Sequence, residues 1–429
     1  MRDASSHSRI SAALAGIPAR FAERRAATPM LLFTAALLAA PVTHGAELTE
    51  DLAAAVAGST VNLGFRYRFE AVDDDAFTKD AWANTLRSRL TVAPKPVAGF
   101  GVLLEVDDVR HIGADNFNDT RNGVTSRPGV TDPEGTDLNQ ALLRYTGWKD
   151  TELVLGRQRI ERANQRFVGG VGWRQNEQTF DAGGISHKFG KNLTTSYSWV
   201  GQVNRIQGPD NGTPPADLDS NTHLLDASYV VGPLITVSAY GYLMDFDNAD
   251  SLSNDTYGLR LTGATDVATG WKAGYALEYA EQSDGGDNPV DYDASYYLVE
   301  GSISAARLGF KLGYEVLEGD DAAGSAFRTP LATLHAFQGW ADKFLTTPDA
   351  GVEDLYFAVT GKALGADLIV RIHDFSAESS SADWGTELDF SANWPIGKHY
   401  AVLLKGASYD ADDLSTDTSK YWVQLTANF

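Results

Sequence analysis

The chain has 429 residues, no cysteine and a formal net charge of −22. The absence of cysteine excludes a disulfide framework. Beyond the first 46 residues, no apolar run is long enough for a transmembrane helix. A chain of this length also suits two or three soluble domains, but no linker or composition break separates it into parts, so we expect one domain.

The beginning of the chain has the pattern of a secretory signal. Basic residues within the first 25 positions precede an apolar run at 31–40, and small residues follow up to Ala46. This order is typical of a signal peptide that is cleaved after small residues. We therefore predict a signal peptide at 1–46 and a single domain at 47–429, with Met30 as an alternative start of translation.

Alternating residues predict β-strands in the rest of the chain. From Val61 to Glu70, apolar side chains occupy every second position, which is the period of a strand with one polar face. The pattern recurs and indicates eighteen strands, with sixteen as the alternative; an even number is expected of a bacterial membrane barrel. The expected strands lie at 61–70, 84–93, 99–110, 138–147, 151–160, 178–187, 193–203, 222–230, 234–244, 255–263, 270–280, 293–302, 306–317, 353–361, 365–374, 385–394, 399–409 and 419–429.

The connections alternate in length. Those after even-numbered strands are short, such as 94–96 and 395–397, whereas most of those after odd-numbered strands are long and acidic, such as 111–137 and 318–352. Short periplasmic turns and long extracellular loops are typical of an outer-membrane barrel. We therefore predict an all-β fold, an antiparallel transmembrane β-barrel in the outer membrane of a Gram-negative bacterium.

The last strand supports this interpretation. Tyr421, Val423, Leu425 and Ala427 alternate with polar residues, and Phe429 ends the chain. A final amphipathic strand that ends on Phe resembles the signal read by the outer-membrane barrel assembly machinery. We expect this machinery, together with outer-membrane lipid and lipopolysaccharide, among the partners of the protein.

Basic residues concentrate in the first half of the predicted domain. Between Glu47 and Asp210 there are 19 basic and 22 acidic residues, against 11 and 33 beyond Asp210. Strand phase places Arg66, Arg68, Arg87, Arg89 and Arg144 opposite the apolar face. The phase of Arg157 and Arg159 is ambiguous because Leu155 shares it, and we place both inside because arginine is costly against lipid; Leu155 then has to be an inward-packed exception. The residues expected to line the lumen and set its selectivity are Arg66, Arg68, Arg87, Arg89, Arg144, Arg157, Arg159, Arg166, Arg174 and Asp181.

Two interpretations of these arginines stay open. A basic wall would concentrate anions in the lumen by focusing its field, or the arginines would brace a wide barrel through ion pairs. Two long segments, 160–178 and 318–352, are able to fold inward as a constriction. Glycines give the backbone of the first segment conformational freedom. Trp340 gives the second segment an aromatic ring to bury.

Two blocks of sequence resemble a known family. They read GRQ at 156–158, RFVG at 166–169, GWRQ at 172–175 and TFDA at 179–182, and TPLATLHAFQGWADKFL at 329–345. With the terminal Phe429, they look like the alginate-export family of outer-membrane channels. The resemblance implies an eighteen-stranded barrel with an arginine-lined, anion-selective passage for alginate-like, acidic saccharides. The tight turn at 394–398 offers no long periplasmic plug of the kind that gated polysaccharide export would use.

We expect a porin that favours anionic solutes or saccharides, by export or by diffusion. A non-specific diffusion porin and a non-conducting structural or adhesive barrel are the alternatives. No histidine lies in a pattern that supports catalysis, so we expect no enzyme and no catalytic residue. The acidic loops do not match a calcium-binding loop, and we expect no metal, no cofactor and no nucleic-acid partner.

Overall fold

The computed structural model describes residues 45–429, so residues 1–44 of the predicted signal peptide lie outside the described residues. The chain divides into two compact units, Met1–Leu52 and Ala53–Phe429. A helix, α2 (Gly45–Ala57), spans the division. The strands all lie in the second unit. No helix in the described part of the chain is long and apolar enough to cross a membrane.

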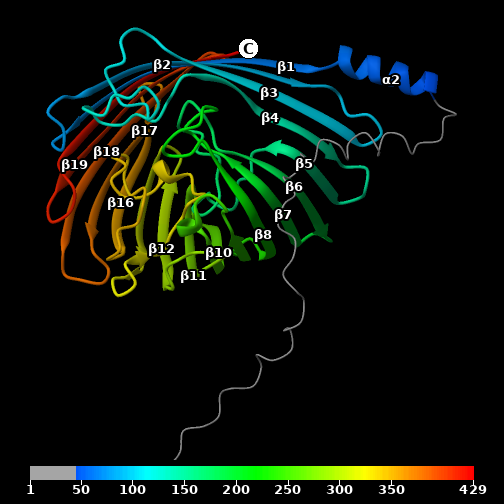
Figure 1. Ribbon diagram of the computed structural model, residues 1–429. Helices are drawn as coiled ribbons and strands as arrows, with labels where there is room; N and C mark the ends of the chain where they lie inside the picture. The colour runs from blue at the N-terminus through cyan, green and yellow to red at the C-terminus, as the bar shows by residue number, and fades with distance from the viewer. Residues whose placement is uncertain (1–44) are drawn as a thin grey trace, which may run out of the picture. The chain divides into compact units, whose positions relative to one another are not determined.

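Eighteen antiparallel strands form one closed sheet, because β1 pairs with both β2 and β20. The prediction of an eighteen-stranded barrel is thereby confirmed, and Figure 1 shows the strands following one another around the wall. The strands are β1 (Thr60–Asp74), β2 (Ala81–Ala93), β3 (Phe100–His111), β4 (Gly135–Tyr145), β5 (Thr151–Gln158), β6 (Thr179–Phe189), β7 (Leu193–Asn204), β8 (Asp217–Gly232), β9 (Ile235–Met244), β10 (Asn254–Ala268), β11 (Trp271–Asp284), β12 (Asp293–Ala305), β13 (Leu308–Leu317), β16 (Val352–Ala363), β17 (Ala366–Ser376), β18 (Asp383–Ile396), β19 (Tyr400–Ala411) and β20 (Thr418–Asn428).

Strand β3 shows why these sequences form a barrel wall. Val102, Leu104 and Val106 are exposed on the outer face, whereas Glu105 and Asp107 are buried on the other face. Apolar residues that point outward and charged residues that point inward reverse the pattern of a soluble sheet. This arrangement suits a wall with lipid outside and a polar lumen inside.

Connections on one rim are tight turns, and those on the other rim are mostly long. The turn between β18 and β19 has only three residues and uses Gly397 at a φ of 64°, a conformation that favours glycine. Two of the long connections, 159–178 and 318–351, do not extend outward. Figure 1 shows green and yellow chain inside the ring of strands, where these two segments lie.

The two inserted segments pack into an apolar cluster within the barrel. Phe167 of the first segment contacts Tyr240 and Tyr296 of the wall and Phe327 of the second segment, with ring centroids 5.1 to 5.7 Å apart. A short hairpin, β14 (Gly319–Asp320) and β15 (Ser325–Ala326), begins the second segment. Packed side chains therefore occupy this part of the lumen.

Candidate channel lining and constriction

Two arginines of β1 hold the first inserted segment against the wall. The Arg66 guanidinium donates to Oε1 of Gln175 at 2.9 Å, to the carbonyl of Gly172 at 2.9 Å and to the carbonyl of Arg174. Arg68 donates to the carbonyl of Trp173 at 2.6 Å and lies over its indole ring at 4.0 Å. Because both arginines are buried and bind main-chain carbonyls, their contacts position the segment.

A second group of arginines lies beside Arg66 and Arg68. We call this group, Arg87, Arg89 and Arg159, the arginine ladder. Arg87 lies directly opposite Arg66 in the β1–β2 register, an arrangement that is unfavourable without counter-charges. The principal counter-charge is Glu177 of the inserted segment, whose carboxylate lies 2.8 Å from Arg89, 3.3 Å from Arg87 and 2.5 Å from Arg159. One carboxylate therefore bridges all three guanidinium groups.

Strand β3 supplies two further carboxylates to the ladder. Asp107 lies opposite Arg89 in the β2–β3 register and accepts from its Nε at 2.6 Å. Glu105 accepts from Arg159 and from Asn139, the latter at 2.8 Å. The ladder thus has three arginines and three carboxylates, and it carries no net charge.

The arginine side chains of the ladder are more exposed than its carboxylate side chains. The side chains of Arg87, Arg89 and Arg159 are 13, 15 and 28% exposed, whereas those of Glu177, Glu105 and Asp107 are 7, 5 and 4% exposed. The arginine side chains are therefore the more exposed members of the ladder, and the carboxylates are the more buried ones.

Glu177 remains ionised in this setting. Burial by itself would raise its pKa, but the charges of Arg89, Arg159 and Arg87 outweigh that effect and lower the pKa of Glu177 to about 2. The link between the inserted segment and the wall is therefore a permanent ion network at neutral pH.

A second ion network joins the two inserted segments. Arg174 of the first segment contacts Glu70 of β1 at 3.1 Å and Asp342 of the second segment at 3.3 Å. Asp342 also accepts from Lys420 of β20 at 2.8 Å and contacts Nδ1 of His335 at 2.7 Å. Burial raises the pKa of Asp342, but His335, Lys420 and Arg174 hold it well below its usual range.

Aromatic rings surround a lysine at this junction. Nζ of Lys405 lies 2.6 Å from Nε2 of His335, 3.7 Å from the ring centre of Trp340 and 4.1 Å from that of Trp173. Burial, followed by Lys405 and Arg174, lowers the pKa of His335 well below its usual value despite Asp342. A neutral His335 can accept from Lys405 and donate to Asp342, so the contacts are mutually consistent.

The remaining predicted lumen residues do not join the ladder. Arg166 is buried in the first inserted segment and donates to Glu315 of β13 at 2.7 Å. Arg144 pairs with Glu152 at 2.7 Å near the short turns, where both side chains are well exposed. Arg157 and Asp181 pair with each other across β5 and β6 at 2.7 Å, near the long-loop rim.

Leu155 lies on the outer wall, so the expectation of an inward-packed residue is wrong. It is 42% exposed and lies next to Leu143 in the β4–β5 register, in line with the outward-facing Val102 of β3. Gly156 follows at a φ of 114°, and a Cβ at this position would lie only 2.3 Å from the carbonyl oxygen of Ala141. The pairing with β4 and β6 continues through Gly156 to Arg157 without a shift in register.

Several key residues were absent from the predicted lumen set. Glu177, Asp342 and Lys405 lie at the centres of the two networks. Glu177 lies in the same short stretch as the arginines and Asp342 lies in the block at 329–345, so the sequence around both carried a usable signal, whereas Lys405 lies outside these blocks. Among the described residues, no group of three His, Asp or Glu side chains has the arrangement of a metal site.

Known proteins share this architecture. The family model described as "Alginate export" matches residues 59–317. No curated protein sequence matches the chain. The solved structures it resembles include OpdL of Pseudomonas aeruginosa (16% identity, TM-score 0.67, covering 87% of this chain and 99% of that chain). They also include OccAB2 of Acinetobacter baumannii (14%, 0.69, 88% and 99%) and the outer membrane protein OpdK of P. aeruginosa (14%, 0.66, 87% and 99%). At these identities, the likeness establishes the fold.

Proposed function

The chain belongs to the alginate-export family and forms an outer-membrane, porin-like barrel, and from this we propose that it conducts anionic solutes, including acidic saccharides. We further propose that its role is transport and not catalysis. Residues 1–46 are, on this proposal, a cleaved signal peptide, and the barrel assembly machinery inserts the domain at 47–429. The inserted segments 159–178 and 318–351 narrow the route.

The observation that carries the preference for anions is the exposure of the arginine ladder. Its arginine side chains are more exposed than its carboxylates, so the net charge of zero does not describe the field in the water. In a passage narrowed by protein, this field is screened less than at an open surface. Arg also offers a carboxylate a planar, two-pronged partner.

Single-channel recording under a salt gradient tests this proposal. Arg159→Gln removes the most exposed member of the ladder. At about 8 Å in water, one charge is worth about 0.5 kcal/mol, so the preference for anions over cations should fall by at least about twofold. The reversal potential should move toward the equilibrium potential of the cation. This shift should be larger at 0.01 M salt, where the Debye length is about 30 Å.

Two matched variants control for nonspecific effects. Glu177→Gln removes a negative charge from the same group and should shift the reversal potential in the opposite direction. Arg144→Gln makes the same change as Arg159→Gln, but at an exposed pair near the short turns, and should have a smaller effect. An unchanged preference in Arg159→Gln would mean that the ladder only braces the wall, and absence of current in the wild type would favour a non-conducting structural barrel.

A further inference from the structure

The outer wall carries a groove that the proposed route does not use. It has a volume of about 930 Å³ and crosses β5 to β10, where exposed, outward-facing side chains such as Ile185, Leu225 and Tyr257 line it. Tyr197, Leu225 and Tyr257 form its sides, and they lie in one row of the sheet. Ala227 and Ala239 lie opposite each other in the adjacent row and leave it open because they are small.

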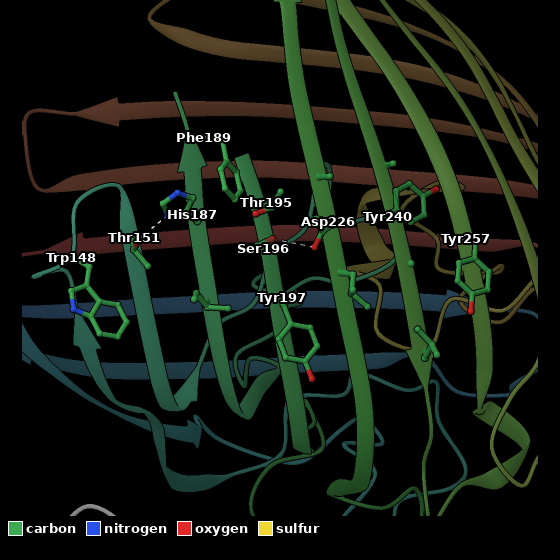
Figure 2. A pocket seen from close by; sticks show the side chains of 16 residues that line it. Trp148, Thr151, His187, Phe189, Thr195, Ser196, Tyr197, Asp226, Tyr240 and Tyr257 are labelled. Atoms are coloured by element: carbon green, nitrogen blue, oxygen red, sulfur yellow. Dashed lines mark hydrogen bonds between the residues drawn. The ribbon is translucent and has the colours of Figure 1, made fainter. Parts of the chain in front are cut away.

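One end of the groove reaches the rim of short turns. Figure 2 shows Trp148, Thr151, His187 and Phe189 gathered at one end, with Tyr257 at the other. Thr151 and His187 are joined by a hydrogen bond of 2.8 Å, and Trp148 is exposed. Exposed Trp at a barrel rim marks the level of the lipid headgroups, so this end lies where the headgroups of the periplasmic leaflet are found.

Positive charge gathers at the same end. Lys149, Lys188 and Lys191 are exposed, and none of them forms an ion pair within 4.0 Å among the described residues. The main chains of the two turns are joined by a hydrogen bond from Lys188 to Asp150 at 2.9 Å. With Asp150 as the one acidic residue in these turns, three lysines leave a local charge of +2.

We propose that this groove binds an anionic phospholipid of the periplasmic leaflet. One acyl chain lies along the apolar groove between Tyr197 and Tyr257, and the phosphate lies among Lys149, Lys188 and Lys191. The volume is within the range of about 300–1,000 Å³ that is usual for small-molecule sites. Basic residues at the membrane surface attract anionic headgroups, and lipopolysaccharide occupies the opposite leaflet.

Lipid retention by the folded, detergent-purified barrel tests the site. In native mass spectrometry with equal amounts of phosphatidylglycerol and phosphatidylcholine, the wild type should retain one phosphatidylglycerol in preference. K149E/K188E/K191E should lower that preference by about a hundredfold or more, at roughly fivefold per lysine. The control K272E/R307E/K398E makes the same charge change at other short turns and should retain the wild-type preference.

A second pair of variants tests the acyl chain. Ala227→Phe fills the groove and should abolish retention, whereas Ala273→Phe places the same ring on the outer face of β11, away from the groove, and should not. Equal retention of the two lipids by the wild type, or an unchanged preference in the lysine variant, would overturn the proposal. A species of two barrels that Ala227→Phe abolishes would assign the groove to a second copy and would also overturn it.

A labelling experiment needs no variant. Phosphatidylglycerol with a photoreactive diazirine on its acyl chain should label peptides from β7 to β9 of the wild-type barrel in phospholipid vesicles. Labelling spread evenly around the wall would contradict a defined site.

Discussion

At the scale of single residues, arginine serves two different purposes in this protein. Arg66 and Arg68 bind main-chain carbonyls of an inserted segment, and Arg166 is buried against Glu315. Arg87, Arg89 and Arg159 instead lie at the edge of the water. Strand phase treats Arg66, Arg68, Arg87 and Arg89 alike, and only their partners distinguish residues that hold a segment from residues that line the lumen.

The buried pair of Arg166 and Glu315 allows a test of the first purpose. Arg166→Met should destabilise the folded barrel by about 3–5 kcal/mol, because it leaves the carboxylate of Glu315 buried without its partner. The double variant Arg166→Met/Glu315→Gln should recover much of this loss. Denaturant unfolding followed by tryptophan fluorescence measures both, and a double variant no more stable than the single one would contradict this account.

The pKa of Glu177 predicts how the ladder responds to pH. Its folded-state pKa of about 2 is below the ordinary value of 4.5, so its ionisation stabilises the folded state. This contribution is fully present above about pH 4.5 and is lost as the pH falls through about 2. The contribution of Glu177 to the reversal potential should therefore be the same at pH 7 and pH 5. The difference in reversal potential between the wild type and Glu177→Gln measures it, and a difference that shrinks by pH 5 would show that Glu177 is protonated too early.

At the scale of elements, the two inserted segments behave as one unit. Phe167 and Phe327 join them in the apolar cluster, Arg174 and Asp342 join them by an ion pair, and Lys405 lies between a tryptophan from each. Segments with so many contacts to the wall are held in a fixed position, as the proposed constriction requires. Their removal should change the width of the route and leave the strands in place.

Replacing residues 331–344 with a Gly-Ser-Gly linker tests this constriction. Single-channel conductance should rise by at least about twofold, because the size of the narrowest opening limits the passage of ions. Deleting Gly286 and Asp287, which are exposed in the loop between β11 and β12, should leave conductance unchanged. Equal conductance in the linker variant and the wild type would show that the segment does not narrow the route.

At the scale of the whole molecule, the last residue extends the pairing that closes the sheet. Phe429 exchanges two main-chain hydrogen bonds with Leu63 of β1, at 2.9 and 3.0 Å, and its ring stacks on His399. These bonds extend the β1–β20 pairing that closes the barrel and removes its free edges.

Deleting Phe429 should therefore lower the yield of the folded, heat-modifiable barrel. It removes two hydrogen bonds worth about 1 kcal/mol each, together with the terminal aromatic ring. Phe429→Ala retains the main-chain bonds and isolates the contribution of the ring. Gel mobility before and after heating measures the folded fraction, and wild-type yields for both variants would show that the chain end has no part in assembly.

The sequence by itself determined the strand number, the alternation of apolar and polar faces, and the contrast between short turns and long loops. These are local properties, because a period of two and the length of a connection can be read along the chain. The terminal pattern through Phe429 is local in the same way. The inward side of Arg66, Arg68, Arg87 and Arg89 followed from this periodicity alone.

Only the tertiary structure decided what those arginines contact. Glu177 lies 88 residues from Arg89 and Asp342 lies 168 residues from Arg174, and no period along the chain relates such positions. Leu155 shows the other limit, because its inward placement was inferred from the cost of arginine against lipid, whereas the structure exposes it on the outer wall. The charge that the lumen presents depends on which member of each ion pair is nearer to water, and folding brings those members together from distant segments.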